Sequence, residues 1–98
     1  ITLSLATDFN PGSCHIQSMP FIMTLACMHL RMTIEEAFQA ATFHGALALE
    51  LEEKIGSIEV GKSADLIVWD ISSLLDIPYY VEEDCTPNWD CEEWGSCI

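Results

Sequence analysis

The placement of two apolar runs is the sequence feature that most constrains what this chain can fold into. Residues 1–6 are rich in β-branched and leucine side chains, as expected for a strand that is buried on both faces. Residues 64–69 read as a second strand, and a long loop, two or three helices and a turn lie between the two runs. A parallel-type strand cannot satisfy its own backbone groups, so its neighbours must lie elsewhere. Because the chain opens at Ile1, directly in the first apolar run, we also expect its amino end to be cut.

The helical patterns carry clear start signals. Ser18 can cap a first helix. Thr33 and Glu36 have the spacing of a capping box at the start of a second helix, which we expect to be interrupted near Gly45. The apolar stretch over residues 19–30 is twelve residues long, whereas a membrane-spanning helix needs about twenty. These patterns predict buried core helices, with the four methionines as packing residues.

The charge balance excludes two classes of partner. Three basic residues stand against sixteen acidic ones, and the net charge is −13. Nucleic-acid backbones and anionic membrane surfaces both require clusters of Lys and Arg, so we expect neither partner. The excess is uneven, because residues 81–98 hold six acidic and no basic side chains.

Asp8 is the best candidate for chemistry that the residues themselves offer. It follows the first predicted strand, at the end where barrel and doubly wound folds place their active sites. An aspartate before an Asn-Pro-Gly turn usually caps or braces that turn. The pattern alone does not favour the catalytic role over this structural one.

Several stretches resemble a known family. The first is Ala6-Thr7-Asp8-Phe9-Asn10-Pro11-Gly12-Ser13, which is similar to the last-strand motif of the imidazolonepropionases, a family of metal-dependent amidohydrolases. Residues 18–20, 32–37 and 77–79 resemble the same family in the same order. Residues 55–66 resemble a Gly-Ser to Ala-Asp-Leu stretch that is common to amidohydrolases generally. The resemblance extends from residue 1 to about residue 80.

The resemblance implies an α/β fold that is incomplete on its own. Residues 1–54 would be the last β/α unit of a (β/α)8 barrel, and residues 55–80 would supply strands of a small, composite β-sandwich domain. Residues 81–98, an acidic tail rich in Cys and Trp, depart from the family pattern.

The resemblance also implies the site and its cofactor. Asp8 would be the last ligand of a single catalytic zinc or iron ion, and its carboxylate would carry a proton from the attacking water to the leaving ring nitrogen. Asn10, Gly12 and Ser13 would face the substrate. A catalytic zinc site needs about three protein ligands, and the family's other ligands have no counterpart in this chain. His15, His29 and His44 match no ligand position.

The reaction implied is hydrolysis of the cyclic amide C–N bond of 4-imidazolone-5-propanoate to N-formimino-L-glutamate, in histidine breakdown. The resemblance further implies a cytoplasmic enzyme whose full-length form is compatible with a homodimer. We expect the isolated chain to be inactive. The alternatives are another cyclic amidohydrolase or deaminase, and a non-catalytic remnant whose Cys-rich tail binds a partner.

Three other groups of residues need an interpretation. Lys62 and Asp65 are expected to have structural roles at the turn into a strand, and His15 retains a substrate contact as an alternative to a surface position. Three cysteines alternate with tryptophans near the end of the chain: Cys85, Trp89, Cys91, Trp94 and Cys97. They resemble the start of a thrombospondin type 1-like repeat, which is disulfide-bonded, and a Cys₃ metal site is the alternative.

Overall fold

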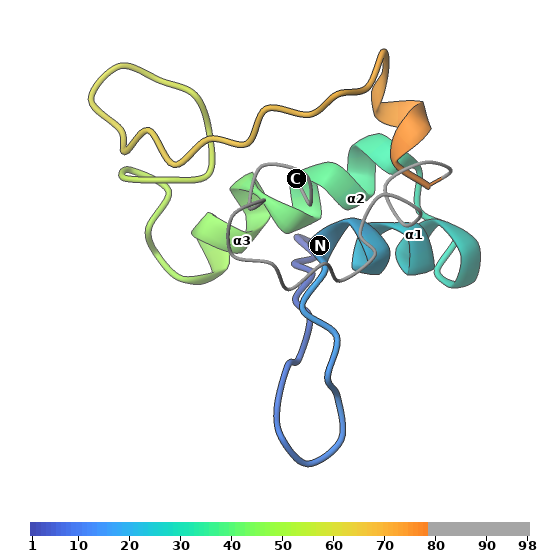
Figure 1. The fold of residues 1–98 in the computed structure, drawn as a ribbon. Coiled ribbons are helices and arrows are strands. Elements are labelled where there is room, and N and C mark those ends of the chain that lie inside the picture. Colours follow the sequence, from blue (N-terminus) through green and yellow to red (C-terminus); the bar gives the residue numbers. More distant parts are fainter. Residues whose placement is uncertain (79–98) are drawn as a thin grey trace, which may run out of the picture.

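The computed structural model describes residues 1–78, and its regular elements are all helical. They are α1 (Met19–His29), α2 (Ile34–Ala41), α3 (Phe43–Ala48) and the 3-10 helix η1 (Leu74–Asp76). Helix α2 contacts α1, α3 and η1 (Figure 1). The loop that precedes α1 projects away from the helices, and the segment from α3 to η1 passes over their other side (Figure 1).

Helix α1 begins where the sequence predicts. The Oγ of Ser18 accepts a hydrogen bond from the Phe21 N–H at 3.3 Å, and Pro20 stands in the first turn. Proline is tolerated there because the first amides of a helix have no partner within it. The helix ends when Leu30 donates its N–H to the Ala26 carbonyl and Arg31 adopts a left-handed φ of 57°.

Helix α2 begins with the predicted capping box, which is confirmed. Thr33 accepts from the Glu36 N–H at 3.2 Å, and the Glu36 carboxylate accepts from the Thr33 N–H at 2.8 Å. The interruption comes at Thr42 (φ −121°, ψ −92°), three residues earlier than predicted, and Gly45 lies inside α3. The hydroxyl of Thr42 donates to the Phe38 carbonyl at 2.8 Å, and such back-bonding competes with the helical pattern.

The two predicted strands do not form within residues 1–78. Neither residues 1–6 nor residues 64–69 pair with another segment, and the Asn10–Cys14 bridge is the one β-type pairing in this part of the chain. The physical reason is that a β-ladder needs a neighbouring strand, which this part of the chain does not offer. The Leu5 N–H instead donates to the Ala40 carbonyl of α2 at 3.0 Å.

The core lies between α1 and α2, where the segment leading into η1 covers it. Its buried members are Met23, Ala26, Ile34, Ala37 and Ile77. Trp69, Ile71 and Leu74 pack against them from the covering segment. We call α1, α2 and residues 69–78 the helical body.

The apolar residues outside this core divide sharply in their burial. Met32 packs at the edge of the core, but Met28 is 68% exposed, so the prediction that every methionine packs in the core is wrong for Met28. Leu66, Ile67 and Val68, from the second predicted strand, are exposed. Among the helices that the structure describes, none combines the length and apolar character that crossing a membrane requires.

Candidate functional site

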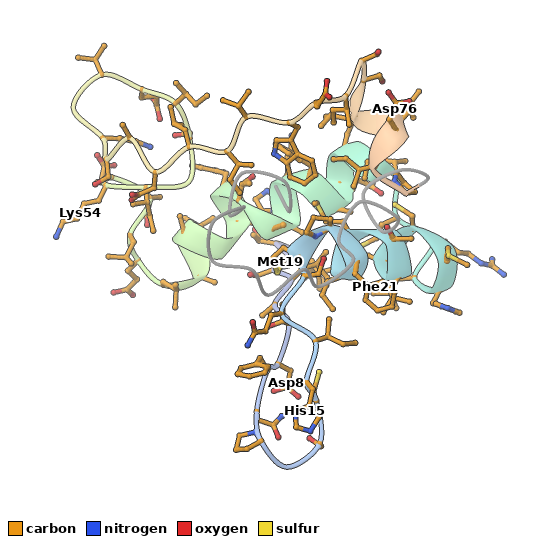
Figure 2. The ribbon with its side chains drawn as sticks, in the orientation of Figure 1. Asp8, His15, Met19, Phe21, Lys54 and Asp76 are labelled. Atoms are coloured by element: carbon orange, nitrogen blue, oxygen red, sulfur yellow. The ribbon has the colours of Figure 1, made fainter. Side chains whose placement is uncertain are left out.

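The predicted site residues lie together on one exposed loop, residues 7–15, which we call the Asp8 loop. Figure 2 shows Asp8 and His15 on this loop, away from the helices. Asp8, Gly12 and Ser13 are exposed, and Asn10 is half-buried. A surface hollow lined by residues 70–72 and 76 lies beside η1 and contains none of the predicted site residues.

The side chain of Asn10 organises the Asp8 loop. Its Oδ1 accepts hydrogen bonds from the Gly12 N–H at 2.9 Å, the Ser13 N–H at 2.8 Å and the Ser13 hydroxyl at 3.1 Å. Its Nδ2 donates to the backbone carbonyl of Asp8 at 2.7 Å. One amide group therefore links the residue that precedes the turn to the two residues that complete it.

Three further hydrogen bonds close the base of the loop. The Asn10 N–H donates to the Cys14 carbonyl at 2.8 Å, which forms the antiparallel bridge between the two arms. The Cys14 thiol donates to the Thr7 carbonyl at 3.3 Å, and the Thr7 hydroxyl accepts from the Phe9 N–H at 3.3 Å. All of these hydrogen bonds join residues of the Asp8 loop to one another.

Asp8 has an unusual backbone and an unengaged carboxylate. Its φ is +53°, in the left-handed region that non-glycine residues rarely adopt. Within residues 1–78, its side chain makes no hydrogen bond, and the turn is braced by Asn10 instead. The structural role that the sequence pattern offered for Asp8, bracing the turn, therefore belongs to Asn10. An Asn before Pro-Gly is the sequence signal for this role, because Asn side chains bond the backbone two residues on.

The metal that the family resemblance implies can be tested against the donors in residues 1–78. The Asp8 carboxylate is a suitable oxygen ligand for zinc or iron, and it is exposed. No three His, Cys, Asp or Glu side chains within residues 1–78 lie close enough together to hold an ion. The Asp8 carboxylate therefore fits one ligand position, and a catalytic zinc site would need about two more ligands from outside residues 1–78.

The three histidines do not gather around Asp8. His15 shares its loop and is exposed, and His29 is exposed in the last turn of α1. His44 is half-buried on α3, where its ring centroid lies 6.1 Å from that of Phe43.

Lys62 lies outside the Asp8 loop and fills the predicted structural role. Its Nζ lies 2.6 Å from a Glu59 carboxylate oxygen and donates to the Ser57 hydroxyl at 2.6 Å. The hydrogen bond from Lys62, with a second from Ser57, holds the pKa of Glu59 below its ordinary value. Lys62 therefore stabilises the turn over residues 57–62 through its contacts with Glu59 and Ser57. Asp65, three residues further on, is exposed.

The predicted Cys-rich module or Cys₃ site (residues 85–97) lies outside the residues that the structure describes.

Comparison with known proteins gives a consistent result. A protein named imidazolonepropionase from Bacteroides fragilis is 49% identical over 83 residues, which are 85% of this chain and 20% of that protein. Imidazolonepropionases from Symbiobacterium thermophilum and Alkaliphilus metalliredigens are 48% and 45% identical over 80 residues, 82% of this chain and 19% of each relative. The chain therefore spans about a fifth of the length of these relatives. The sequence profile of the amidohydrolase family matches residues 1–89, and the chain belongs to that family.

Proposed function

We propose that residues 1–80 are the carboxy-terminal part of an imidazolonepropionase. The reaction is hydrolysis of the cyclic amide C–N bond of 4-imidazolone-5-propanoate, which yields N-formimino-L-glutamate in histidine breakdown. The observation that carries the proposal is the 49% identity over 83 residues to a relative of that name. The exposed Asp8 carboxylate supports the proposal, because Asn10 and not Asp8 stabilises the turn through side-chain hydrogen bonds. The activity belongs to the complete enzyme, and the isolated chain is expected to be inactive.

The proposed parent fold is a (β/α)8 barrel with a small β-sandwich domain. Residues 1–54 would form the last β/α unit of the barrel, and residues 55–80 would supply strands of the sandwich. The exposed side chains of Leu3, Leu66, Ile67 and Val68 support this arrangement, because apolar strands of this kind are normally covered on both faces. In the complete protein, neighbouring strands would supply the missing backbone partners.

Asp8 is the residue on which we place the chemistry. With ligands from outside the described residues it would hold one zinc or iron ion, which activates water and polarises a carbonyl. The Asp8 carboxylate would accept a proton from the attacking water and deliver it to the leaving ring nitrogen. The exposure of this carboxylate, which makes no hydrogen bond to residues 1–78, supports these roles.

The turn after Asp8 is proposed to face the substrate. The Ser13 hydroxyl can accept a hydrogen bond while it donates to Asn10. One of the two Nδ2 protons of Asn10 is used by the Asp8 carbonyl, and the other can reach outward. Gly12 adds no side chain, so a ligand can approach its backbone closely.

A chimera provides the direct test. Residues 1–80 replace the matching segment of the Bacteroides fragilis relative, and ring opening is followed by loss of the imidazolone's ultraviolet absorbance. We expect the chimera to be active, and Asp8→Asn to lower kcat about 10²- to 10⁴-fold, as loss of a group that transfers protons does. Asp65→Asn, which removes an exposed carboxylate outside the Asp8 loop, should leave kcat unchanged.

A folded chimera that opens other cyclic amides, but not imidazolone propionate, would replace the proposed substrate. Full activity in Asp8→Asn would remove Asp8 from the mechanism. The proposal also includes one metal ion per chain, a homodimer and a cytoplasmic setting for the complete enzyme. Metal analysis and light scattering of the chimera test the first two of these statements.

A further inference from the structure

We propose that Asn10 is a positioning residue that sets the direction of the Asp8 carboxylate. The catalytic consequence rests on the proposed function, whereas the conformational statement concerns this chain alone. Asn10 would then act through Asp8, in addition to any contact of its own with a substrate.

The backbone of Asp8 is the part of the loop that needs support. A left-handed φ such as its +53° is disfavoured for residues with a side chain, although Asp adopts it more readily than most, and neighbouring hydrogen bonds help to hold it there. The direction of the side chain depends on this φ, because φ and ψ together fix the direction of the Cα–Cβ bond. A loop that let Asp8 relax to an ordinary φ would aim the carboxylate elsewhere.

The support comes from the two ends of one rigid amide. Nδ2 of Asn10 donates to the Asp8 carbonyl at 2.7 Å, and this bond orients the peptide group that follows Asp8. Oδ1 of the same amide is held by the Gly12 and Ser13 N–H groups at 2.9 and 2.8 Å. The turn therefore fixes the amide, and the amide fixes Asp8.

This double role explains the residue type. Aspartate at position 10 could accept from the Gly12 and Ser13 amides, but it could not donate to the Asp8 carbonyl. Alanine could do neither. Among short side chains, only asparagine carries an acceptor and a donor on one planar group. Asn10→Asp and Asn10→Ala therefore separate the bracing of the turn from the support of Asp8.

The conformational test uses the 98-residue chain and nuclear magnetic resonance. In Asn10→Ala we expect amide exchange at Gly12 and Ser13 to rise about 2- to 10-fold, the change that follows from losing one ordinary hydrogen bond. In Asn10→Asp this exchange should stay near its original rate. In both variants the couplings of Asp8 should show that φ leaves the left-handed region.

Gln17→Ala is the matched control. Gln17 also has a side-chain amide, is exposed between the Asp8 loop and α1, and makes no side-chain hydrogen bond within residues 1–78. It should change neither readout. The proposal is overturned if Asp8 keeps its positive φ in Asn10→Asp, or if Gly12 and Ser13 exchange at their original rates in Asn10→Ala.

The catalytic test uses the chimera with the same variants. Positioning predicts that Asn10→Asp lowers kcat while KM changes little, whereas a role limited to substrate binding predicts a raised KM with kcat retained. The second result would overturn the positioning role in catalysis. An inactive parent chimera would overturn the proposed function instead, and the conformational test would still decide the role of Asn10 in the free chain.

Discussion

The helical body and the Asp8 loop are held together by different forces. In the helical body, apolar side chains exclude water, and Ala37 and Ile77 are 0% and 1% exposed. In the Asp8 loop nearly every residue touches solvent, and hydrogen bonds between close neighbours supply the order. The difference indicates that the stabilising core and the proposed site occupy separate parts of this chain. Changes in one region should therefore leave the other nearly intact.

The most severe test of this separation is a change in the helical body. Ile77→Ala removes the largest fully buried side chain, so we expect the free energy of unfolding to fall by about 2–5 kcal/mol, as for other buried Ile truncations. Leu75→Ala, at a 61% exposed position in η1 just before Ile77, should cost less than about 0.5 kcal/mol. Urea titration measures both. Equal effects would show that residues 69–78 do not pack as described.

Two glycines, Gly56 and Gly61, test how closely the segment after α3 packs against that helix. A Cβ at Gly56 (φ +92°) would lie 2.5 Å from the Ala46 Cβ, and we expect Gly56→Ala to cost about 2–4 kcal/mol through strain and overpacking. Gly61 has nearly the same φ (+91°), but a Cβ there would meet no atom of residues 1–78 within 4 Å, so Gly61→Ala should cost about 1–2 kcal/mol from the backbone alone. Thermal unfolding of the two variants isolates the clash. If their midpoints coincide, Gly56 is not pressed against Ala46.

A smaller effect is expected at the start of α2. Thr33→Ala removes the side-chain half of the capping box and should cost about 1 kcal/mol. Thr33→Ser keeps the hydroxyl and should behave like the original chain. Circular dichroism during urea titration gives both values. If Thr33→Ala left the free energy of unfolding unchanged, packing alone would hold this end of α2.

The smallest effect on stability belongs to the Asp8 loop. Asp8→Gly relieves the left-handed strain but frees the unfolded chain, so the free energy of unfolding should change by less than about 1 kcal/mol. The same substitution should abolish ring opening by the chimera. If Asp8→Gly instead destabilised the chain as much as Ile77→Ala, the loop would belong to the core and the two regions would not be separate.

The sequence predicted the features that depend on neighbouring residues. Ser18 and the Thr33–Glu36 pair marked the helix starts correctly, because a cap needs only a side chain and the adjacent backbone. The break at Thr42 was misplaced at Gly45, since a hydroxyl that bonds back to its own helix leaves little trace in the pattern.

The features that depend on distant segments could not be predicted as they appear. Residues 1–6 and 64–69 have strand-like composition, yet strands form only against partners, and residues 1–78 supply none. At the site, the family resemblance directed attention to Asp8, Asn10, Gly12 and Ser13, and these residues do share one loop. What the pattern did not reveal is the division between the Asp8 carboxylate, which is unengaged within residues 1–78, and the Asn10 amide that braces the turn.

The hydrogen bond from Leu5 to Ala40 makes the Leu5 amide a probe of how residues 1–6 move relative to α2. Leu5 lies three residues before Asp8, and its N–H donates to the Ala40 carbonyl in the last turn of α2. This hydrogen bond joins the segment that leads into the Asp8 loop to a core helix. The Leu5 amide proton can exchange with solvent only when this hydrogen bond opens. The deuterium uptake of a single amide thus reports how often the segment leading to Asp8 lifts from α2, and a tighter covering of residues 1–6 would slow that uptake.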